Sequence, residues 1–400
     1  MYDKTDFDAV VKAASIGKEI QSRIGKMKHI GQNLSSCCPF HSEKTPSFVV
    51  SETKGIYKCF GCGETGDVIS FVAKHDNISQ SDAMRKLAKD YGIRITERKE
   101  EKIENLQQMY TALKIASIKF SSELLHNKAI KRYIVERGIK NADILKTWNI
   151  GYAPDKYDLV ADKEALKAVG LLGPNGYIFR DRITFPIEDV AGRIIGFTAR
   201  SLTSTKQKYL NTQETEIFHK GTVLYGLRQA LSSIRIHKTA IIVEGTFDVI
   251  NMHNLGMPMT VGTLGTSFTL EHAQIIARYA DNCILLFDGD NAGKRATERA
   301  IRNLLASGIK KIEVSVLAPG IDPAMFKSDE EVPDSISIIK FLFETREGDI
   351  EQKIRDVLSI IAESKSMLKR DLLIRELAEI SGVSQYALVD ELNSILSRKI

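Results

Sequence analysis

The sequence predicts an α/β protein of several domains: a small cysteine-rich unit, a mixed α/β region, a parallel β-sheet domain and a helical C-terminal region. Four of the five cysteines lie between positions 37 and 62. After Thr239, apolar strands alternate with amphipathic helices, the pattern of a parallel sheet that helices cover on both faces. From about Ser335 the remaining segments all have helical patterns, as in the stretch that ends at Gly382, a residue suited to a helix C-cap.

The composition is that of an ordinary globular protein. Hydrophobic residues make up 43% and charged residues 27% of the 400 residues, which excludes a disordered, collagen-like or disulfide-dependent miniprotein. This length suits two to four domains at about 100–200 residues each. No apolar run reaches the roughly 18–20 residues that cross a bilayer, and the N-terminus lacks the charged and apolar regions of a signal peptide. We therefore expect a soluble, cytoplasmic protein.

The first functional motif is a set of metal ligands near the N-terminus. The spacing Cys38-x2-His41-x17-Cys59-x2-Cys62 places two chelating pairs on two tight turns. Three thiolates and one imidazole form the tetrahedral shell of soft ligands that zinc prefers, and a shell closed by four protein ligands is structural rather than hydrolytic. The segment 47–59 between the pairs alternates in the manner of two strands joined by a turn. The sequence therefore predicts a zinc ribbon.

Two features of this unit leave alternatives open. Cys37 is an alternative to Cys38, although the turn at Pro39 and Phe40 fits the tighter pair. The ribbon also carries cations that alternate with aromatic residues, a pattern that suits single-stranded nucleic acid because bases stack and phosphates pair with cations. Core packing explains half of these aromatics equally well. The residues of this pattern are Lys44, Phe48, Lys54, Tyr57, Lys58 and Phe60.

A boundary between the first unit and the rest falls at residues 97–102, consecutive charged residues that suit a linker or an exposed helix start. A helical pattern runs over residues 105–133, and residues 176–200 have the alternation of strands joined by a hairpin. Between positions 190 and 213 there are four cations and no acid, so this stripe suits phosphate binding although the net charge is only +5. The four cations are Arg193, Arg200, Lys206 and Lys208.

Carboxylates follow the apolar strands of the predicted parallel sheet. Glu244 ends the strand at 239–243, and Asp288 and Asp290 follow the strand at 282–287. Ligands collect outside the carboxyl ends of the strands in such a sheet. Carboxylates that converge there repel one another unless a divalent cation neutralises them, and oxygen ligands select Mg²⁺ or Mn²⁺. The pattern therefore predicts metal-assisted phosphoryl transfer.

Two further acids belong to the same predicted edge. The strand at 312–317 leads to Asp322, and Asp248 lies one helical turn after Glu244, projecting toward the same crevice. A second interpretation makes Asp290 and Asp322 caps of helices or turns.

Two glycines and one cysteine of this region have structural interpretations. Gly289 and Gly293 allow the backbone to approach its neighbours closely. Cys283 lies in an apolar run and is expected to be a small buried residue. The segment around the glycines falls short of a nucleotide-binding Gly-x4-Gly-Lys-Ser/Thr loop, so we do not expect a motor driven by ATP.

These residues together resemble a known family, the DnaG-type DNA primases of bacteria and their phages. The zinc-binding domain of that family is similar to CPFHSEKTPSF and YKCFGCGETGDVISFV. Its RNA-polymerase domain is similar to RITFPIEDVAGRIIGFTAR and KYLNTQETEIFHKGTVLYGL. Its TOPRIM (topoisomerase–primase) fold is similar to VEGTFDVI, TLGTSFT and LLFDGDNAGKRA. The matching segments span about residues 35–322 in the order that the family has.

The resemblance implies roles for the matching residues of this sequence. The implied zinc ligands are Cys38, His41, Cys59 and Cys62. The implied catalytic residues are Glu244, Asp288 and Asp290, and the implied magnesium ligands are these three together with Asp322. The implied nucleic-acid or nucleotide contacts are Arg193, Arg200, Lys208, Asn211, Lys220 and Asp248, and Arg182 lies in the same matching stretch.

The resemblance also implies an activity, cofactors and partners. The expected activity is that of a DNA-dependent RNA primase, which makes short RNA primers on single-stranded DNA by nucleotidyl transfer during replication. The expected cofactors are one structural zinc ion and catalytic Mg²⁺ or Mn²⁺. The expected partners are the single-stranded DNA template, ribonucleoside triphosphates, the RNA–DNA primer duplex and a replicative helicase, and no membrane is involved.

Two departures from the family pattern bear on these expectations. The family usually has Asp-Pro-Asp where this chain has Asp322, Pro323 and Ala324, which affects one metal or the choice between Mg²⁺ and Mn²⁺. The family usually carries a further C-terminal helicase-binding domain, whereas this sequence stops at Ile400. We expect either a trimmed chain or a short primase of a phage or mobile element.

We divide the sequence into four parts and weigh two rival functions. The parts are a zinc ribbon (1–100), the N-terminal part of the polymerase core (101–235), a TOPRIM domain (236–330) and a helical C-terminal part (331–400). One rival is a TOPRIM nuclease or topoisomerase, but a type I topoisomerase also needs a nucleophilic tyrosine in a separate domain, which we do not identify. The other is a non-catalytic zinc-ribbon DNA-binding protein, and the intact set of metal-binding acids argues against it.

Overall fold

The structure, a computed structural model, has two compact units, Met1–Asn105 and Leu106–Ile400. The described residues are 4–76, 78–93, 98–139, 142–203, 207–265, 267–327 and 332–398. Helix α5 (Arg98–His126) begins within the charged run 97–102 and continues into the second unit. Two residues of the sequence predictions, Glu97 of the charged run and Lys206 of the basic stripe, lie outside the described residues. Among the described residues, no helix is both long enough and apolar enough to cross a membrane.

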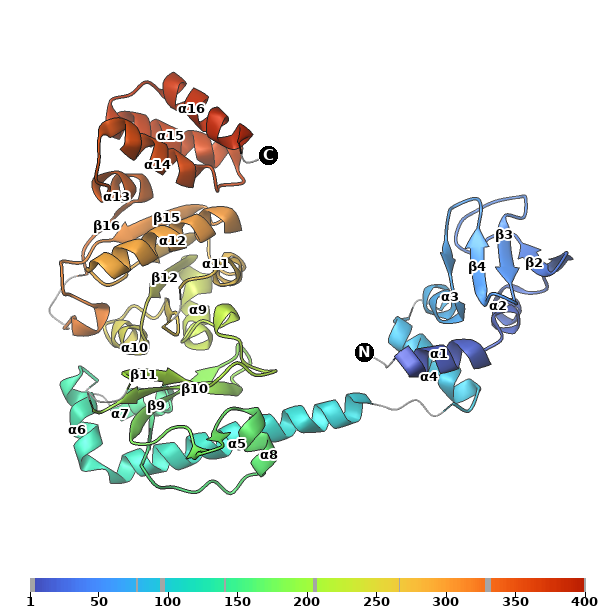
Figure 1. The fold of residues 1–400 in the computed structure, drawn as a ribbon, viewed down its shortest axis with the longest axis horizontal. Helices are drawn as coiled ribbons and strands as arrows, with labels where there is room; N and C mark the ends of the chain where they lie inside the picture. The colour runs from blue at the N-terminus through green and yellow to red at the C-terminus, as the bar shows by residue number, and fades with distance from the viewer. Residues whose placement is uncertain are drawn as a thin grey trace. The chain divides into compact units, whose positions relative to one another are not determined.

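The N-terminal unit is a five-stranded antiparallel sheet whose strands follow one another in sequence order, with helices packed beside it (Figure 1). Strands β3 and β4 pair with Val50 opposite Tyr57, so the predicted ribbon is present. The elements are α1 (Lys4–Ala13), α2 (Ile16–Ile24), β1 (Lys28–Ile30), β2 (Asn33–Ser36), β3 (Phe48–Ser51), β4 (Ile56–Cys59), β5 (Thr65–Gly66), α3 (Val68–His75) and α4 (Gln80–Asp90).

Aromatic packing forms the centre of this unit. The rings of Phe40, Phe48, Tyr57 and Phe71 lie with centroids between 5.2 and 6.2 Å apart. Phe48 and Tyr57 are buried, so these two aromatics of the ribbon pack in the core. Phe60 is 69% exposed, and the Lys58 ammonium lies 5.3 Å from its ring centroid. Of the three aromatics in the pattern expected to bind single-stranded nucleic acid, Phe60 is therefore the one that is exposed, and it lies beside Lys58.

The second unit begins with a mixed α/β part. Its four-stranded antiparallel sheet has the order β11-β10-β9-β6, and β9 and β10 form the predicted hairpin. The elements after α5 are α6 (Lys128–Glu136), α7 (Ala142–Thr147), β6 (Gly151–Ala153), α8 (Lys163–Ala168), β7 (Leu172–Gly173), β8 (Gly176–Tyr177), β9 (Arg182–Glu188), β10 (Ile194–Ser201), β11 (Tyr209–Asn211), η1 (Lys220–Thr222) and α9 (Leu227–His237).

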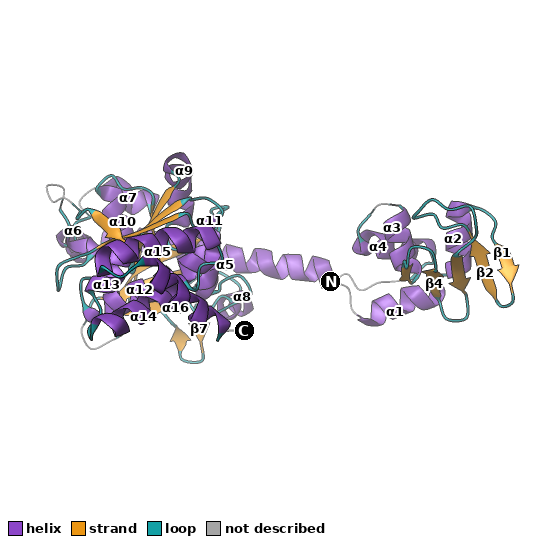
Figure 2. Cartoon of the chain, turned by 90° about the horizontal axis from the view of Figure 1, so that it is seen from above, coloured by secondary structure: helices purple, strands orange, loops and turns teal. Residues whose placement is uncertain are grey.

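A second sheet of five strands follows, and helices lie on both sides of the strands of this unit (Figure 2). Its order is β13-β12-β14-β15-β16, with parallel pairing except for the antiparallel edge strand β16. The elements are β12 (Thr239–Val243), α10 (Thr246–Asn254), β13 (Thr260–Gly262), α11 (Leu270–Ala277), β14 (Asn282–Leu285), α12 (Asn291–Ser307), β15 (Lys311–Ser315), η2 (Pro323–Met325) and β16 (Ser335–Ser337).

Alternating side chains of β12 explain why both faces of this sheet are covered. Ala240 and Ile242 belong to a core shared with α9, α11 and α12, whereas Ile241 and Val243 belong to a core shared with α10. Successive side chains of a strand point to opposite faces, so a continuous apolar strand needs a partner on each side.

The C-terminal helices continue the core of the parallel sheet. They are α13 (Ile338–Glu344), α14 (Ile350–Ile361), α15 (Met367–Ser381) and α16 (Gln385–Ser397). The prediction that every segment after about Ser335 is helical is wrong at its start, because Ser335–Ser337 pairs with β15 as strand β16. Gly382 ends α15 in the left-handed conformation, with φ at +71°, as its position predicted.

Candidate metal and nucleotide site

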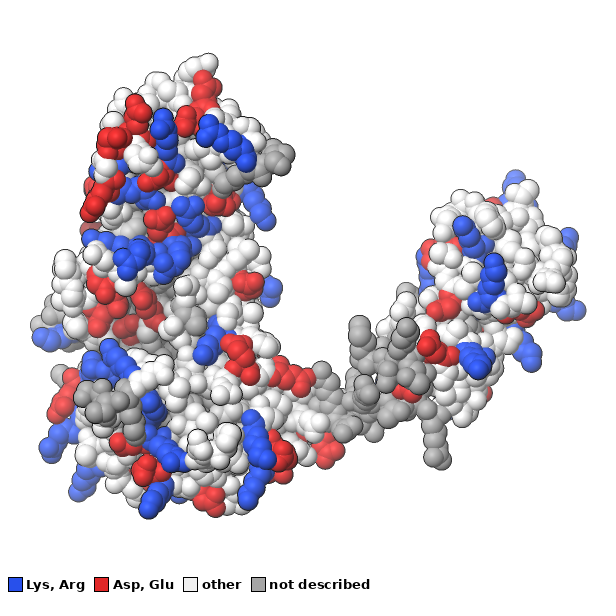
Figure 3. Space-filling view, in the orientation of Figure 1, with Lys and Arg blue, Asp and Glu red and all other residues white. Residues whose placement is uncertain are grey.

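The predicted carboxylates lie at one edge of the parallel sheet. Strands β12 and β14 are adjacent and parallel, so Glu244 and Asp288, which follow them, come to the same edge. The backbone N–H of Asp288 donates to Oε1 of Glu244 at 3.3 Å. Figure 3 shows acidic side chains gathered at this level of the second unit, with Lys and Arg side chains over α12 on one side of them and near β11 on the other.

Burial and mutual repulsion disfavour the charged forms of Glu244 and Asp288. Burial and the charge of Asp288 raise the pKa of Glu244, and burial and the charges of Asp322 and Asp290 raise the pKa of Asp288. Oδ1 of Asp288 and Oδ1 of Asp322 are buried and have no hydrogen-bond partner in the protein. Buried carboxylate oxygens of this kind are costly unless a ligand binds them, so the site fits a divalent cation.

Gly289 brings the loops that carry these acids together, and Gly293 lets the chain fold back closely on Asp288. A Cβ atom on Gly289 would lie 2.0 Å from the carbonyl oxygen of Ala318, and one on Gly293 would lie 2.0 Å from that of Asp288. The N–H of Gly289 also donates to the carbonyl oxygen of Ile321 at 3.0 Å. The predicted need for close backbone approach is confirmed, and this contact joins the loops that carry Asp288 and Asp322.

Asp290 and Asp322 differ in their local roles. Oδ1 of Asp290 accepts from the N–H of Gly293 at 2.7 Å, so this exposed residue is the N-cap of α12. Asp322 precedes η2 but makes no capping hydrogen bond with its side chain. The capping interpretation therefore holds for Asp290, which has a second oxygen left for a ligand, and fails for Asp322.

Helix α10 holds the Asp322 turn with two buried side chains. Oδ2 of Asp248 accepts from Gly245 N–H at 2.7 Å, and Oδ1 accepts from Ala324 N–H at 3.1 Å. The amide of Asn251 donates to the carbonyl oxygens of Pro323 and Phe326, both at 3.0 Å. Asp248 is 7% exposed and burial raises its pKa to about 7. Asp248 lies within electrostatic range of Asp288, Asp322 and Glu244, as expected for a residue of the same crevice, although both of its oxygens bind backbone N–H groups.

Sequence reasoning missed Asn251. Its signal in the sequence is a polar residue three positions after Asp248, on the same face of the helix.

The residues of the expected basic groove separate into buried and exposed groups. Arg200 is 6% exposed and donates to the hydroxyls of Tyr133 and Tyr209 at 3.0 and 2.8 Å. Asn211 donates to the carbonyl of Leu264, while its buried Oδ1 has no partner in the protein. Lys208 is exposed, and its positive charge opposes the raised pKa of Asp288. Lys208, on the connection between β10 and β11, therefore lies within electrostatic range of Asp288.

Two of the other expected cations, Arg193 and Arg182, are engaged locally. Arg193 pairs with Asp189 at 2.7 Å and stacks its guanidinium over the ring of Tyr110 at 4.5 Å. Arg182 is 5% exposed and donates to the carbonyl of Gln207 at 2.9 Å. Lys220 is half-buried in η1, with its backbone N–H bound to Glu214.

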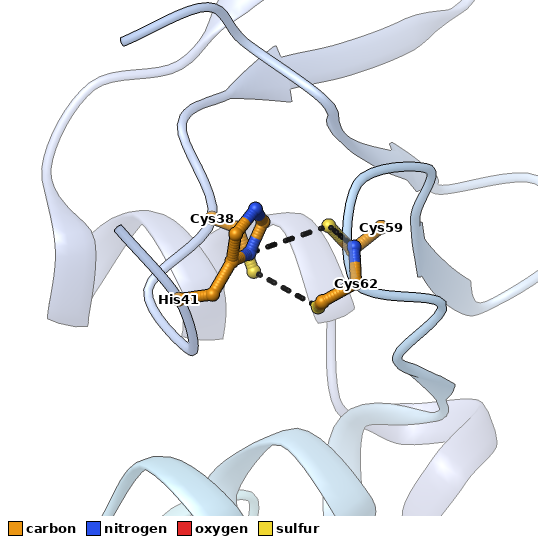
Figure 4. A group of neighbouring side chains, drawn as sticks. All are labelled: Cys38, His41, Cys59 and Cys62. Carbon is orange, nitrogen blue, oxygen red and sulfur yellow. Dashed lines mark hydrogen bonds between the residues drawn. The ribbon is translucent and has the colours of Figure 1, made fainter. Parts of the chain in front are cut away.

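The Cys–His group lies in the N-terminal unit and brings Cys38, His41, Cys59 and Cys62 together (Figure 4). One ligand atom from each lies within 4.8 Å of the others. Backbone N–H groups of Phe40 and Cys62 donate to the sulfurs of Cys38 and Cys59 at 3.4 Å. Cys37 is exposed and is not a member of this group. The donor set of three sulfurs and one imidazole fits zinc.

Glu43 supports these ligands and was missed by sequence reasoning. Its Oε1 accepts from the N–H of Cys38 at 2.7 Å, and its Oε2 lies 3.2 Å from Nε2 of His41. The hydroxyl of Ser47 donates to Oε2 at 2.6 Å and is the largest influence that lowers the pKa of Glu43. A carboxylate on the outer nitrogen of a ligand histidine orients the ring and raises its basicity. Its sequence signal is an acid two positions after His41.

Comparison with known proteins places this geometry in a family. The chain matches the CHC2 zinc finger over residues 2–103, the N-terminal domain of the DNA primase catalytic core over 119–231 and the Toprim domain over 238–318. A DNA primase of Clostridium acetobutylicum is 34% identical over a region that covers 95% of this chain and 68% of that protein. The chain belongs to the DNA primase family.

Further relatives and solved structures agree with this assignment. A DNA primase of Aquifex aeolicus is 34% identical, and the match covers 84% of this primase and 71% of that protein. The crystal structure of the Aquifex aeolicus primase, with its zinc-binding and RNA polymerase domains, superposes with a TM-score of 0.63 at 31% identity, covering 96% of this chain and 98% of that one. A DnaG catalytic domain bound to single-stranded DNA superposes with a TM-score of 0.64 at 28% identity, covering 71% and 99%.

The primase is thus an enzyme of the class that synthesises RNA primers for DNA replication, with the predicted order of zinc ribbon, mixed α/β part, Toprim sheet and C-terminal helices. Its cofactors are the structural zinc ion of a CHC2 finger and the catalytic Mg²⁺ of a Toprim domain. The comparisons support neither a Toprim nuclease or topoisomerase nor a non-catalytic DNA-binding protein.

Proposed function

We propose that this chain synthesises short RNA on a single-stranded DNA template and that Glu244, Asp288, Asp290 and Asp322 hold the catalytic cations. The observation that carries the proposal is the pair of buried carboxylate oxygens, on Asp288 and Asp322, that have no hydrogen-bond partner in the protein. Divalent cations bound there would neutralise the acids and polarise the triphosphate under attack by a 3′-hydroxyl. No side chain of this edge needs to act as a general base.

We propose that Lys208 binds the incoming nucleotide, because it is exposed and lies within electrostatic range of Asp288. Its ammonium would bind phosphate oxygens as a point charge. Lys220 and Arg193 would add phosphate contacts from the same part of the unit. Arg200 and Asn211 would act as positioning residues, because the Arg200 guanidinium donates to Tyr133 and Tyr209 and the Asn211 amide N–H donates to Leu264.

The zinc unit would bind the template strand. Cys38, His41, Cys59 and Cys62 would hold the zinc ion, and the exposed pair of Lys58 and Phe60 would offer one stacking ring and one cation to a single strand. Two solved relatives of the catalytic part are complexes with single-stranded DNA and with double-stranded DNA. These complexes support a template and a primer duplex as partners of this chain.

The four-part division of the chain at residues 100, 235 and 330 remains our proposal. A replicative helicase is the further partner that we propose, and the cytoplasm is the compartment in which the enzyme would act.

The test of the catalytic assignment is synthesis without a primer. The protein is incubated with unprimed single-stranded DNA, four ribonucleotides and either Mg²⁺ or Mn²⁺, and short RNA is measured. We expect Asp288→Ala to lower product formation at least about 100-fold, as loss of a metal-binding or charge-stabilising group does. Asp334→Ala is the matched control, because Asp334 is an exposed acid on the connection before β16. Equal synthesis by the two variants would refute the assignment.

A second test addresses the zinc ligands. We expect one zinc ion per chain in the unmodified protein and in Cys37→Ala, and loss of zinc in Cys38→Ala, since Cys37 is exposed outside the group. Zinc is measured by elemental analysis of the purified proteins. Loss of zinc from Cys37→Ala with retention in Cys38→Ala would reverse the assignment.

A further inference from the structure

A cavity of about 600 Å³ lies on the second unit, away from the carboxylates. It is lined by the C-terminal end of α12, the loop between α14 and α15, and the first turns of α15. Figure 1 shows the C-terminal helices stacked beyond α12 at this end of the unit. The lining residues are Gln274, Leu305, Ala306, Ser307, Gly308, Lys310, Ser364, Lys365, Ser366, Leu368, Lys369 and Leu372.

The charged residues that line this cavity are all lysines. Lys310 pairs with Asp281 at 3.1 Å on the surface, and Lys365 is exposed. Lys369 is more enclosed, and its ammonium donates to the backbone carbonyl of Ile309. With three cations and no carboxylate among the lining residues, the cavity favours an anion.

Ser364 gives the cavity a buried polar group with an unmet bond. The residue is 1% exposed, and its Oγ has no hydrogen-bond partner in the protein. The neighbouring hydroxyls are engaged, since Ser307 donates to the carbonyl of Leu304 and Ser366 accepts from the N–H of Lys369. A buried hydroxyl without a partner costs free energy, and a ligand oxygen in the cavity would remove that cost.

Helix α15 adds its positive end to the same place. Ser366 is its N-cap, and the helix begins with Met367 and Leu368, so its first-turn N–H groups lie beside the lysines. The N-terminus of a helix attracts an anion through its unpaired N–H groups and its dipole. Leu305, Leu368 and Leu372 form the apolar part of the lining.

We propose that this cavity binds a small organic phosphate. Lysines bind phosphate as point charges, whereas a planar carboxylate is typically recognised by the fork of an arginine, and no arginine is among the lining residues. The leucines accommodate the carbon part of such a ligand, and the volume lies within the range of small-molecule sites.

The site is distinct from the carboxylate edge. Helix α12 has its N-cap, Asp290, among the acids and its last residue, Ser307, in the cavity lining. Its 17 residues span about 25 Å at 1.5 Å per residue. A ligand in the cavity therefore does not occupy the place of the substrate.

The amine of Lys369 can be labelled by a chemical probe that carries a phosphate. Burial lowers the pKa of this lysine to about 8, so part of its amine is unprotonated in mildly alkaline buffer. Pyridoxal 5′-phosphate combines a phosphate with an aldehyde. The unprotonated amine attacks the aldehyde carbon, water leaves and an imine forms, which borohydride reduces to a stable secondary amine.

The experiment treats the full chain with pyridoxal 5′-phosphate or with pyridoxal, which lacks the phosphate, and then with borohydride. Peptide mass spectrometry identifies each labelled lysine, which separates this cavity from lysines near the carboxylates. Pyridoxal is the less reactive aldehyde toward any amine because its free hydroxyl closes on the aldehyde, so the ratio of the two half-labelling concentrations (pyridoxal over pyridoxal 5′-phosphate) is compared with the same ratio at the exposed Lys340. We expect this ratio to be about tenfold larger at Lys369 than at Lys340, since the phosphate adds charge-assisted bonds in the cavity. Equal ratios at the two lysines would overturn the proposal, because they would reveal a reactive amine without phosphate recognition.

Two variants and a control complete the test. We expect Ser364→Ala and Lys365→Gln each to raise the half-labelling concentration of the phosphate reagent about three- to tenfold. Lys340→Gln, which removes an exposed lysine of α13, is expected to leave it unchanged. Lys365 is exposed, so its variant tests the proposal even where Ser364→Ala fails to fold. Labelling that is unchanged in Lys365→Gln, or that spreads evenly over the exposed lysines, would also overturn it.

Discussion

Replacement of Asn251 by alanine removes the amide that ties helix α10 to the turn carrying Asp322. The amide donates to the carbonyl oxygens of Pro323 and Phe326, both at 3.0 Å, and the side chain is 2% exposed. Asn251 touches none of the acids through these bonds, so its effect on the reaction would arise from the position of the turn.

The magnitude follows from the two hydrogen bonds. Each contributes about 1 kcal/mol net, and a buried carbonyl left without a donor costs about 1–3 kcal/mol. We therefore expect Asn251→Ala to weaken the attachment of the turn by about 2–4 kcal/mol. A loss near 3 kcal/mol raises the population of the detached turn about 100-fold, since 1.4 kcal/mol corresponds to a factor of ten.

Native-state hydrogen exchange measures this detachment directly. The N–H of Met325 donates to the carbonyl of Asp322 at 3.0 Å, and the N–H of Ala324 donates to Asp248. We expect the protection of both amides to fall about 100-fold in Asn251→Ala, and primer synthesis to fall with it.

The matched control is Asn303→Ala. The Asn303 amide also donates to a backbone carbonyl, that of Phe268 at 2.7 Å, but it lies on α12 away from the turn. Unchanged protection of Met325 in Asn251→Ala, or an equal loss in Asn303→Ala, would refute the reasoning.

Three further predictions concern local contacts. Glu43→Gln removes the charge that faces His41, and we expect zinc affinity to fall about 10–100-fold in competition with a chelator. Arg23 contacts Asp76 with two bonds and holds the pKa of that carboxyl well below its usual range. A lowered pKa contributes stability above the ordinary value near 4 that is lost as the pH falls, so urea unfolding of Asp76→Asn is expected to show a deficit of about 2 kcal/mol at neutral pH that shrinks in acid. Gly289→Ala would force a Cβ to 2.0 Å from a backbone oxygen, and we expect a loss of about 3 kcal/mol in urea unfolding.

Each of these predictions has a control and a contradicting result. Glu64→Gln is the control for Glu43, because Glu64 pairs with an exposed lysine, and equal zinc affinity of the two variants would contradict the role of Glu43. A stability deficit of Asp76→Asn that stays constant into strong acid would exclude the ion pair as its cause. Gly221→Ala is the control for Gly289, since its Cβ would have 3.7 Å of space, and equal stability of these variants would contradict the close contact.

Features that depend on neighbours in the chain were predictable. The spacing Cys38-x2-His41 and the apolar strands β12 and β14 are local patterns. Each can be recognised from a few consecutive residues, because the side-chain period of a strand or turn repeats over that length. The convergence of Glu244 and Asp288 also followed from the sequence, since parallel strands deliver their carboxyl ends to one edge.

Charge alone was a poor guide to exposure. Arg200 and Asp248 were expected at a binding surface, yet both are nearly buried, because Tyr133 and Tyr209 bind the arginine and backbone N–H groups bind the aspartate. The short strand β16 was also missed, because three residues are too few to show a period and their pairing depends on β15.

The residues alone predicted the zinc ribbon, the parallel sheet and the acids at its edge. Short ligand spacings identify the ribbon, and the order of strands and helices along the chain identifies the sheet and its edge. The polar contacts across long separations in the chain became visible only in the folded molecule. Asn251 reaches a turn more than 70 residues away, and Lys369 reaches Ile309 across 60. Such contacts depend on how packed elements meet, a property that no local period encodes.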